Sequence, residues 1–232
     1  MKRFEESLPQ GYVEAKTIDA KNGKTAVAFT VGSLVLTLAV FVVVWLALFR
    51  GEPVADSLDR LVPDENWTSL VRIAVFFAAY LLYVVLHELV HGAVYKAFTK
   101  QKLTFGVTLT VAYCGIPNLY VYRTVALCAL LAPFVVFVPV FLVPMFLLES
   151  YADVLICGAL LAFHVGGCIG DLYDAALYAF VFTDKTTLMR DTGPKQTFYV
   201  KNSASENKIV ETISEKANDA DCENERHPDS NV

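Results

Sequence analysis

The residues with the clearest chemical potential form one short run, His87-Glu88-Leu89-Val90-His91. Histidines four residues apart lie on the same face of a helix, about one turn apart, so both imidazoles can reach a single ion. Neutral imidazole nitrogens are common ligands of zinc. The glutamate of this motif is not a ligand, because its role is to take a proton from the water that the ion activates. The spacing predicts zinc bound by His87 and His91, with Glu88 as the catalytic base.

A chance match, or a polar network without metal, is the alternative interpretation of so short a motif. The surrounding segment, residues 68–98, begins as an apolar run and is long enough to cross a membrane. Ionisable side chains are costly in such a helix and usually serve a function there. Two of the only four histidines in the chain lie in this motif. These observations favour a metal site.

Two histidines do not complete a catalytic zinc site, which usually has three protein ligands and an open position. A later apolar segment, residues 151–182, contains HVGGCIGDLYDA, with candidate ligands near one helical stripe. These candidates are His164, Cys168, Asp171 and Asp174. The glycines among them, Gly166, Gly167 and Gly170, would let another helix approach closely. We expect the helix with the two histidines to pack there.

The depth of each candidate in the membrane helps to choose among them. With a rise of about 1.5 Å per residue, His87 and His91 lie about 16 and 10 Å inside the cytosolic end of their helix. The same rise places Asp171 at about 16 Å, Asp174 at about 12 Å and His164 at about 27 Å. His164 is therefore too deep to be a ligand and is expected to donate or accept a hydrogen bond behind the site, whereas either aspartate could reach the metal. Asp171 is the favoured third ligand because it follows the glycine run that would admit the metal-bearing helix, and Asp174 is the alternative.

The charges of this ligand set balance. Zinc contributes two positive charges, and Asp171 and Glu88 contribute one negative charge each, so the assembled site is neutral and its burial costs less. Cys168 is expected to be a small packing residue. The five cysteines include no CxxC pair, which argues against a thiolate zinc knuckle or a disulfide framework.

Four long apolar segments must position these residues. The chain has 232 residues and is 55% hydrophobic, and a membrane-spanning helix needs roughly 20 apolar residues. The expected spans are residues 25–49, 68–98, 123–148 and 151–182. Prolines inside the third span should kink it and free carbonyl groups that neighbours must satisfy. The pattern predicts an all-α membrane protein of about four transmembrane helices, the first being a retained anchor rather than a cleaved signal.

Charge orients the predicted bundle. Residues 1–24, the segment 99–122 with its flanks, and the tail together contain 16 of the 19 lysines and arginines. The positive-inside rule places such segments in the cytosol. The expected protein is therefore multi-pass in the cell membrane with both termini cytoplasmic. Its parts are a cytosolic segment 1–24, a transmembrane metallopeptidase-like domain 25–182, and a polar, disordered tail 183–232.

The segment between the second and third spans has a different pattern. Residues 103–113 alternate large apolar with small or polar side chains, which is typical of a β-strand. Gly115, Pro117 and Asn118 then indicate a turn. We expect a short strand or hairpin that could pair with an extended substrate segment. A packed cytosolic loop is the alternative.

Four motifs carry a resemblance to a known family: HELVHG (87–92), YCGIP (113–117), LAP (131–133) and GDLYD (170–174). Over roughly residues 70–180, the chain resembles membrane proteins described as "putative zincin peptidases", and its organisation is similar to that of the site-2 protease class. In that class an aspartate on a later helix is the third ligand, which implies Asp171 here. An asparagine usually precedes that aspartate by a few residues, whereas His164 stands near that place in this chain.

The motif and the resemblance together lead to one expected function. This is a zinc-dependent intramembrane peptidase that cleaves membrane proteins or peptides within or beside the lipid bilayer. The alternatives are a membrane metal-binding protein without protease activity and a non-enzymatic membrane partner or transporter. The sequence has no basic stripe, so we expect no nucleic-acid partner.

Overall fold

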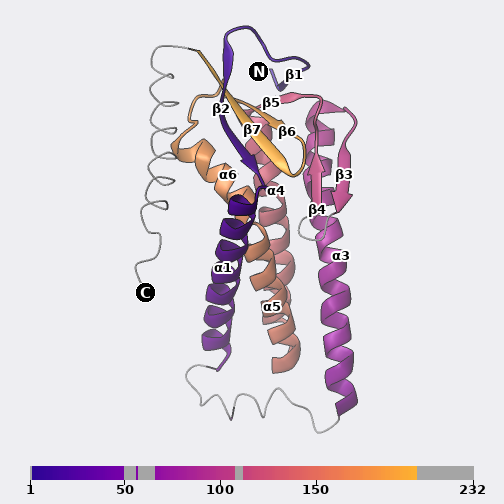
Figure 1. Cartoon of the computed structure of the whole chain (residues 1–232). Coiled ribbons are helices and arrows are strands. Elements are labelled where there is room, and N and C mark those ends of the chain that lie inside the picture. Colours follow the sequence, from indigo (N-terminus) through magenta and orange to yellow (C-terminus); the bar gives the residue numbers. More distant parts are fainter. Residues whose placement is uncertain (1, 50–55, 57–65, 108–111, 203–232) are drawn as a thin grey trace, which may run out of the picture.

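The long helices form one bundle with a small sheet at one end (Figure 1). The structure is a computed structural model that describes residues 2–49, 56, 66–107 and 112–202. The helices are α1 (Gly23–Phe49), α3 (Asn66–Thr99), α4 (Arg123–Leu142), the short 3-10 helix η1 (Val143–Phe146), α5 (Tyr151–Gly167) and α6 (Ile169–Phe180). The chain is thus mostly helical.

Three of these helical segments are long and apolar enough to cross a membrane. They are Gly23–Phe49, Trp67–Thr99 and Arg123–Phe146, and the bent pair α5–α6 makes a fourth if it is counted as one span. Large apolar side chains cover their outer surfaces; Leu34 of α1 and Leu81 of α3, for example, are 67% and 66% exposed. Exposed leucines along several turns suit contact with lipid and indicate association with a membrane.

The fourth expected span, 151–182, is broken rather than continuous. Helices α5 and α6 meet at Cys168 with a bend of 49°. Gly166 and Gly167 directly precede the bend, and glycine is a poor helix former. The bend redirects the chain just before Asp171, which therefore lies in the first turn of α6. Carboxylates are favourable at this end of a helix because of its dipole.

The glycines of this region admit a different helix from the one expected. A side chain at Gly166 would overlap Thr37 and the backbone of Ser33, both on α1. Only Gly167 faces the metal-motif helix, and its contact with Tyr83 of α3 would be an ordinary one. The close approach predicted for α3 is therefore made by α1.

The described residues form seven strands, of which the sequence predicted only a short strand or hairpin between the second and third spans. They are β1 (Phe4–Glu5), β2 (Tyr12–Asp19), β3 (Thr104–Val107), β4 (Ala112–Gly115), β5 (Tyr120–Tyr122), β6 (Leu188–Asp191) and β7 (Lys195–Lys201). Five of them form an antiparallel sheet in the order β1-β5-β6-β7-β2. The mostly helical fold thus carries a small sheet that the sequence did not predict.

The polar ends of the chain are folded where the structure describes them. Strand β2 pairs with β7 over seven residue pairs, from Tyr12 with Lys201 to Asp19 with Lys195. The N-terminal segment and the first part of the tail thus form one unit that caps the bundle (Figure 1). The prediction of a disordered tail from residue 183 was wrong up to Lys201; residues 203–232 lie outside the described residues.

The strand or hairpin expected between the second and third spans is present as a hairpin of β3 and β4. Strands β3 and β4 pair antiparallel, with Phe105 opposite Cys114, and residues 108–111 between them lie outside the described part of the chain. The hairpin lies along the upper half of α3 in Figure 1, and a side chain at Gly92 of α3 would overlap Phe105. The hairpin is therefore packed against the helix that carries the histidine motif.

The turn between β6 and β7 joins the sheet to that same helix. Gly193 has a φ of +96°, and a side chain there would overlap the ring of Tyr113 on β4. The buried carboxylate of Asp191 accepts hydrogen bonds from the Tyr95 hydroxyl at 2.7 Å and from the backbone N–H of Gly193 at 2.8 Å. Because Tyr95 lies one turn after His91, these contacts hold the sheet against the metal-motif helix.

The carboxyl of Asp191 should make the stability of the folded protein depend on pH. Burial raises the pKa of its carboxyl to about 6, although the Gly193 N–H and the Tyr95 hydroxyl act in the opposite direction. The folded protein therefore binds this proton more tightly than the unfolded chain, and its stability rises as pH falls through 6. Between pH 7.5 and 5, we expect metal-free wild type to gain about 1.4 kcal/mol relative to Asp191→Asn. Thermal unfolding in detergent measures this, and a pH-independent difference would contradict it.

Candidate metal centre

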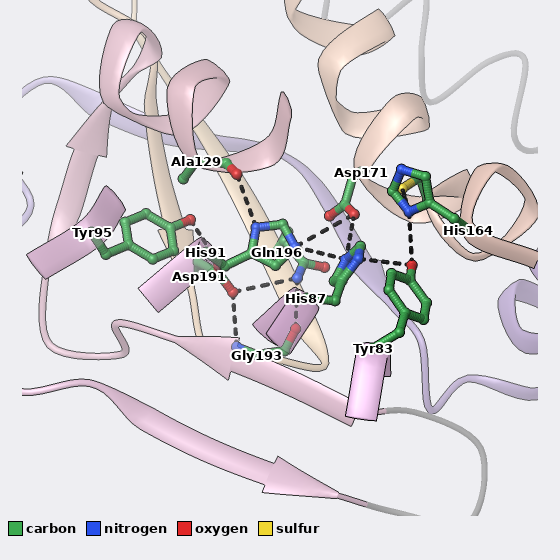
Figure 2. Close-up of polar contacts among 11 residues, drawn as sticks. Tyr83, His87, His91, Tyr95, Ala129, His164, Asp171, Asp191, Gly193 and Gln196 are labelled. Carbon is green, nitrogen blue, oxygen red and sulfur yellow. Dashed lines mark hydrogen bonds and ion pairs between the residues drawn. The ribbon is translucent and has the colours of Figure 1, made fainter. Parts of the chain in front are cut away.

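Three side chains from two helices converge at one point. His87 and His91 come from α3 and Asp171 comes from α6. The Nε2 atoms of the two histidines are 3.2 Å apart, and Oδ2 of Asp171 lies 3.4 Å from that of His87 and 3.5 Å from that of His91. Figure 2 shows the three groups pointing toward one another. The structure thus brings together the three residues proposed as ligands from the sequence.

The spacing of these atoms fits a tetrahedral zinc site. With metal–ligand bonds of about 2.0–2.1 Å and tetrahedral angles, two ligand atoms lie about 3.3–3.4 Å apart. The three observed separations lie close to this value. The set also contains two imidazoles and one carboxylate, a combination used by catalytic zinc sites with a fourth, open position. The residues present therefore fit the ion that the motif implies.

The orientation of His91 depends on a proline in another helix. Its Nδ1 lies 2.9 Å from the carbonyl oxygen of Ala129 on α4. In a regular helix this carbonyl would accept the N–H of the residue four positions later, which here is Pro133 and has no N–H. The freed carbonyl accepts the Nδ1–H of His91 and so leaves the Nε2 lone pair available for metal.

Restoring the missing N–H should therefore weaken metal binding. In Pro133→Ala, the new N–H competes with His91 for the Ala129 carbonyl, and we expect zinc affinity to fall by about 10-fold to 100-fold, as for the loss of other outer partners. Pro139→Ala is the matched control, because it removes a proline from the same helix at another turn. Competition with a zinc-binding dye measures both affinities. Equal zinc affinity in the two variants would show that the proline does not orient His91.

His87 is oriented by a second chain of hydrogen bonds. Its Nδ1 lies 3.0 Å from the hydroxyl of Tyr83, which lies 2.8 Å from Nδ1 of His164. If His87 Nε2 faces the metal, its Nδ1 carries the proton and donates to Tyr83, whose hydroxyl then donates to His164. His164 is fully buried on α5. It therefore lies where the depth argument expected it, behind the three donors.

The remaining candidates lie around this centre. Cys168 is fully buried, with Sγ 3.6 Å from Nδ1 of His164. His87, His164 and Cys168 form a second group close enough to share an ion. In that group the Tyr83 hydroxyl already bonds both histidines, so we favour the first group. Asp174 lies outside both groups.

A cavity of about 730 Å³ gives access to the three donors. It is lined by His87, Glu88 and His91 on one side, by α1 on another, and by α6, β4 and the β6–β7 turn. Glu88 is half-buried in its wall, and the backbone N–H of Cys114 on β4 is directed at its carboxylate. The Glu88 carboxylate, the three potential metal ligands and strand β4 therefore border one space.

Tyr83 and the Ala129 carbonyl were not predicted from the sequence to take part in the site. Tyr83 lies four residues before His87, so the helical spacing that pairs the histidines also places it beneath them. Pro133 was recognised as a residue that frees a carbonyl. Which donor would use that carbonyl depends on packing between α3 and α4, and the sequence does not show this.

Comparison with known proteins finds one family. Residues 80–185 match the family described as "Putative zincin peptidase". The matched segment contains the histidine motif, the hairpin, the proline-containing helix and Asp171, and it confirms the resemblance to the family of "putative zincin peptidases". It indicates a metallopeptidase. Searches of curated proteins and of solved structures find no match.

Proposed function

We propose that the protein is a zinc-dependent intramembrane peptidase with His87, His91 and Asp171 as ligands. The observation that carries the proposal is the convergence of three donor atoms, 3.2–3.5 Å apart, from two apolar helices. The family match supports the class of reaction. Placement of the donors within candidate spans supports cleavage inside or beside the bilayer.

The chain's own residues supply the proton transfers. Zinc, when bound, would lower the pKa of a water molecule and polarise the scissile carbonyl. Glu88, in the cavity wall beside the ligands, takes the proton from the attacking water and later gives it to the leaving amine. The carbonyl of Ala129 and the hydroxyl of Tyr83 keep the two imidazoles in the tautomer that presents Nε2.

An extended substrate suits the cavity. A peptide bond within a helix must be unwound before water can attack it, because helical packing shields its carbonyl. Strand β4 borders the cavity on the side of Glu88, and we propose that it pairs with the unwound segment by strand addition. The hairpin β3–β4 then has a function beyond covering the site.

We also propose an orientation in the cell membrane, based on the distribution of charge. The ends of α1, α3 and α4 next to the sheet all lie at one end of the bundle (Figure 1). Their flanking segments are those with most of the lysines and arginines, so we place the sheet in the cytosol. Both termini are then cytoplasmic.

Removal and return of zinc test the proposed activity. Purified protein in lipid vesicles should cleave synthetic transmembrane peptides, lose this activity on dialysis against a chelator, and recover it with about one equivalent of zinc per chain. Mass spectrometry of the products measures cleavage. Protein that binds zinc but cleaves none of a broad set of membrane peptides would point to a metal-binding protein without protease activity.

A further inference from the structure

Asp174 is a buried carboxylate that the proposed mechanism does not use. Its side chain is on α6 and the residue is only 3% exposed. Among the described residues, its Oδ1 has no hydrogen-bond partner, and its carboxylate takes part in no ion pair. A buried polar group without a partner is rare and calls for an explanation. Asp174 lines the same cavity as the metal ligands.

The described lining of the cavity has an excess of acidic side chains. Four acidic residues line it, namely Glu88, Asp171, Asp174 and Asp191, and none of the described lining residues is lysine or arginine. Zinc would balance Glu88 and Asp171, and Asp191 accepts three hydrogen bonds from Tyr95, Gly193 and Gln196. Asp174 is left without compensation from the cavity wall.

Lys16 is a basic residue that lies outside the cavity but close enough to Asp174 for its charge to act on the carboxylate. Its ammonium lies 6.0 Å from the ring centroid of Tyr173, and its charge acts on Asp174 from strand β2. Lys16 does not line the cavity, and no ion pair joins it to Asp174 among the described residues. Within the described part of the chain, the Asp174 carboxylate therefore borders the cavity without an ion-pair partner.

We infer that Asp174 binds a lysine or arginine side chain of the substrate close to the scissile bond. This inference rests on the proposed peptidase function and names its substrate class. Asp174 follows Asp171 by three residues, so it lies on the same helix face and about 4.5 Å further toward the sheet. In an extended peptide this distance corresponds to about one or two residues.

Membrane-spanning substrates supply such a cation at this level. Lysine and arginine are concentrated at the cytosolic ends of transmembrane segments. With the sheet in the cytosol, the Asp174 side of the cavity faces that end. A substrate segment that enters between α1 and α3 would therefore bring its basic flank to Asp174 as its last apolar residues reach the metal ligands.

Binding of synthetic peptides tests this inference without requiring hydrolysis. The protein is the zinc-loaded Glu88→Gln variant in phosphatidylcholine vesicles. The probes are alanine–leucine transmembrane peptides that carry lysine, norleucine or glutamate at one flank position, which is scanned along the flank. At one position we expect the lysine peptide to bind about tenfold more tightly than the norleucine peptide, as for a charge-assisted contact. Equal binding at every position would overturn the inference.

Variants assign the preference to one residue. Adding Asp174→Asn should reduce the lysine-to-norleucine ratio to near one. Adding Asp153→Asn is the matched control, because that acid pairs with Arg72 away from the cavity, and the ratio should persist. A preference that survives Asp174→Asn would overturn the assignment.

A cross-linking measurement covers the case in which Asp174→Asn fails to fold. Carbodiimide treatment of the bound lysine peptide should join its amine to the Asp174 carboxylate, and mass spectrometry locates the link. Links only to other carboxylates would overturn the inference. If lysine peptides bind at Asp174 but wild type cleaves none of them, the peptidase proposal fails while the cation site stands.

Discussion

Wild-type protein purified in detergent is expected to contain about one zinc per chain, and His87→Ala and Asp171→Ala are each expected to contain almost none. Each change removes one of three donors that lie 3.2–3.5 Å apart. Loss of an outer partner alone costs about 10-fold to 100-fold in affinity, so loss of a ligand should cost more. Metal analysis by mass spectrometry measures the content.

The two variants separate the contributions of the two helices. His87→Ala tests α3, and Asp171→Ala tests whether α6 supplies the third ligand. Asp153→Asn is the matched control for loss of a carboxylate elsewhere in α5–α6, and it should retain zinc. Zinc lost in His87→Ala alone would move the third ligand to Asp174 or His164. Absence of zinc from wild type, even after reconstitution, would contradict the metal site itself.

The part of the site that follows helical periodicity could be predicted from the sequence. His87 and His91 face the same way because four residues make about one turn. Asp171 was preferred over His164 by depth, and the structure places Asp171 beside the two histidines and His164 behind them. The depth estimate assumed a straight fourth span, whereas the helix bends at Cys168, between His164 and Asp171.

The part that depends on contacts distant in sequence could not be predicted. Strands β2 and β7 pair although more than 170 residues separate them, and β7 lies in a stretch whose polar composition suggested disorder. Its run Thr197-Phe198-Tyr199-Val200 has the β-branched and aromatic residues typical of strands. That local signal was available, but the partner strand that buries it was not.

The cap formed by this sheet explains why the polar ends of the chain are folded. Phe198 packs against Tyr178 of α6 and Phe182, with ring centroids 5.1 and 4.9 Å apart. The sheet therefore covers the end of the helix that supplies Asp171, and through Asp191 and Tyr95 it also contacts the helix that supplies the histidines. Both helices that supply the candidate ligands therefore contact the same cap.

Glu88→Gln is expected to abolish most of the peptidase activity while zinc remains bound. Glutamine keeps the size and hydrogen-bonding capacity of the side chain but cannot accept the proton of the attacking water, so kcat should fall by about 10²-fold to 10⁴-fold. Glu88 is absent from the groups of residues close enough to share an ion, so zinc content should stay near one per chain. Peptide cleavage and metal content are measured on the same preparation.

The combination of the two readouts identifies the role of Glu88. Zinc retained with activity lost is the result of removing a base, since the ligand atoms on α3 and α6 are untouched. Glu88→Ala serves as a second variant, because it also removes the contact with the backbone N–H of Cys114; similar losses in both would assign the effect to the missing carboxylate rather than to a displaced β4. Full activity in Glu88→Gln would exclude Glu88 as the base, and loss of zinc together with activity would make Glu88 part of the metal site.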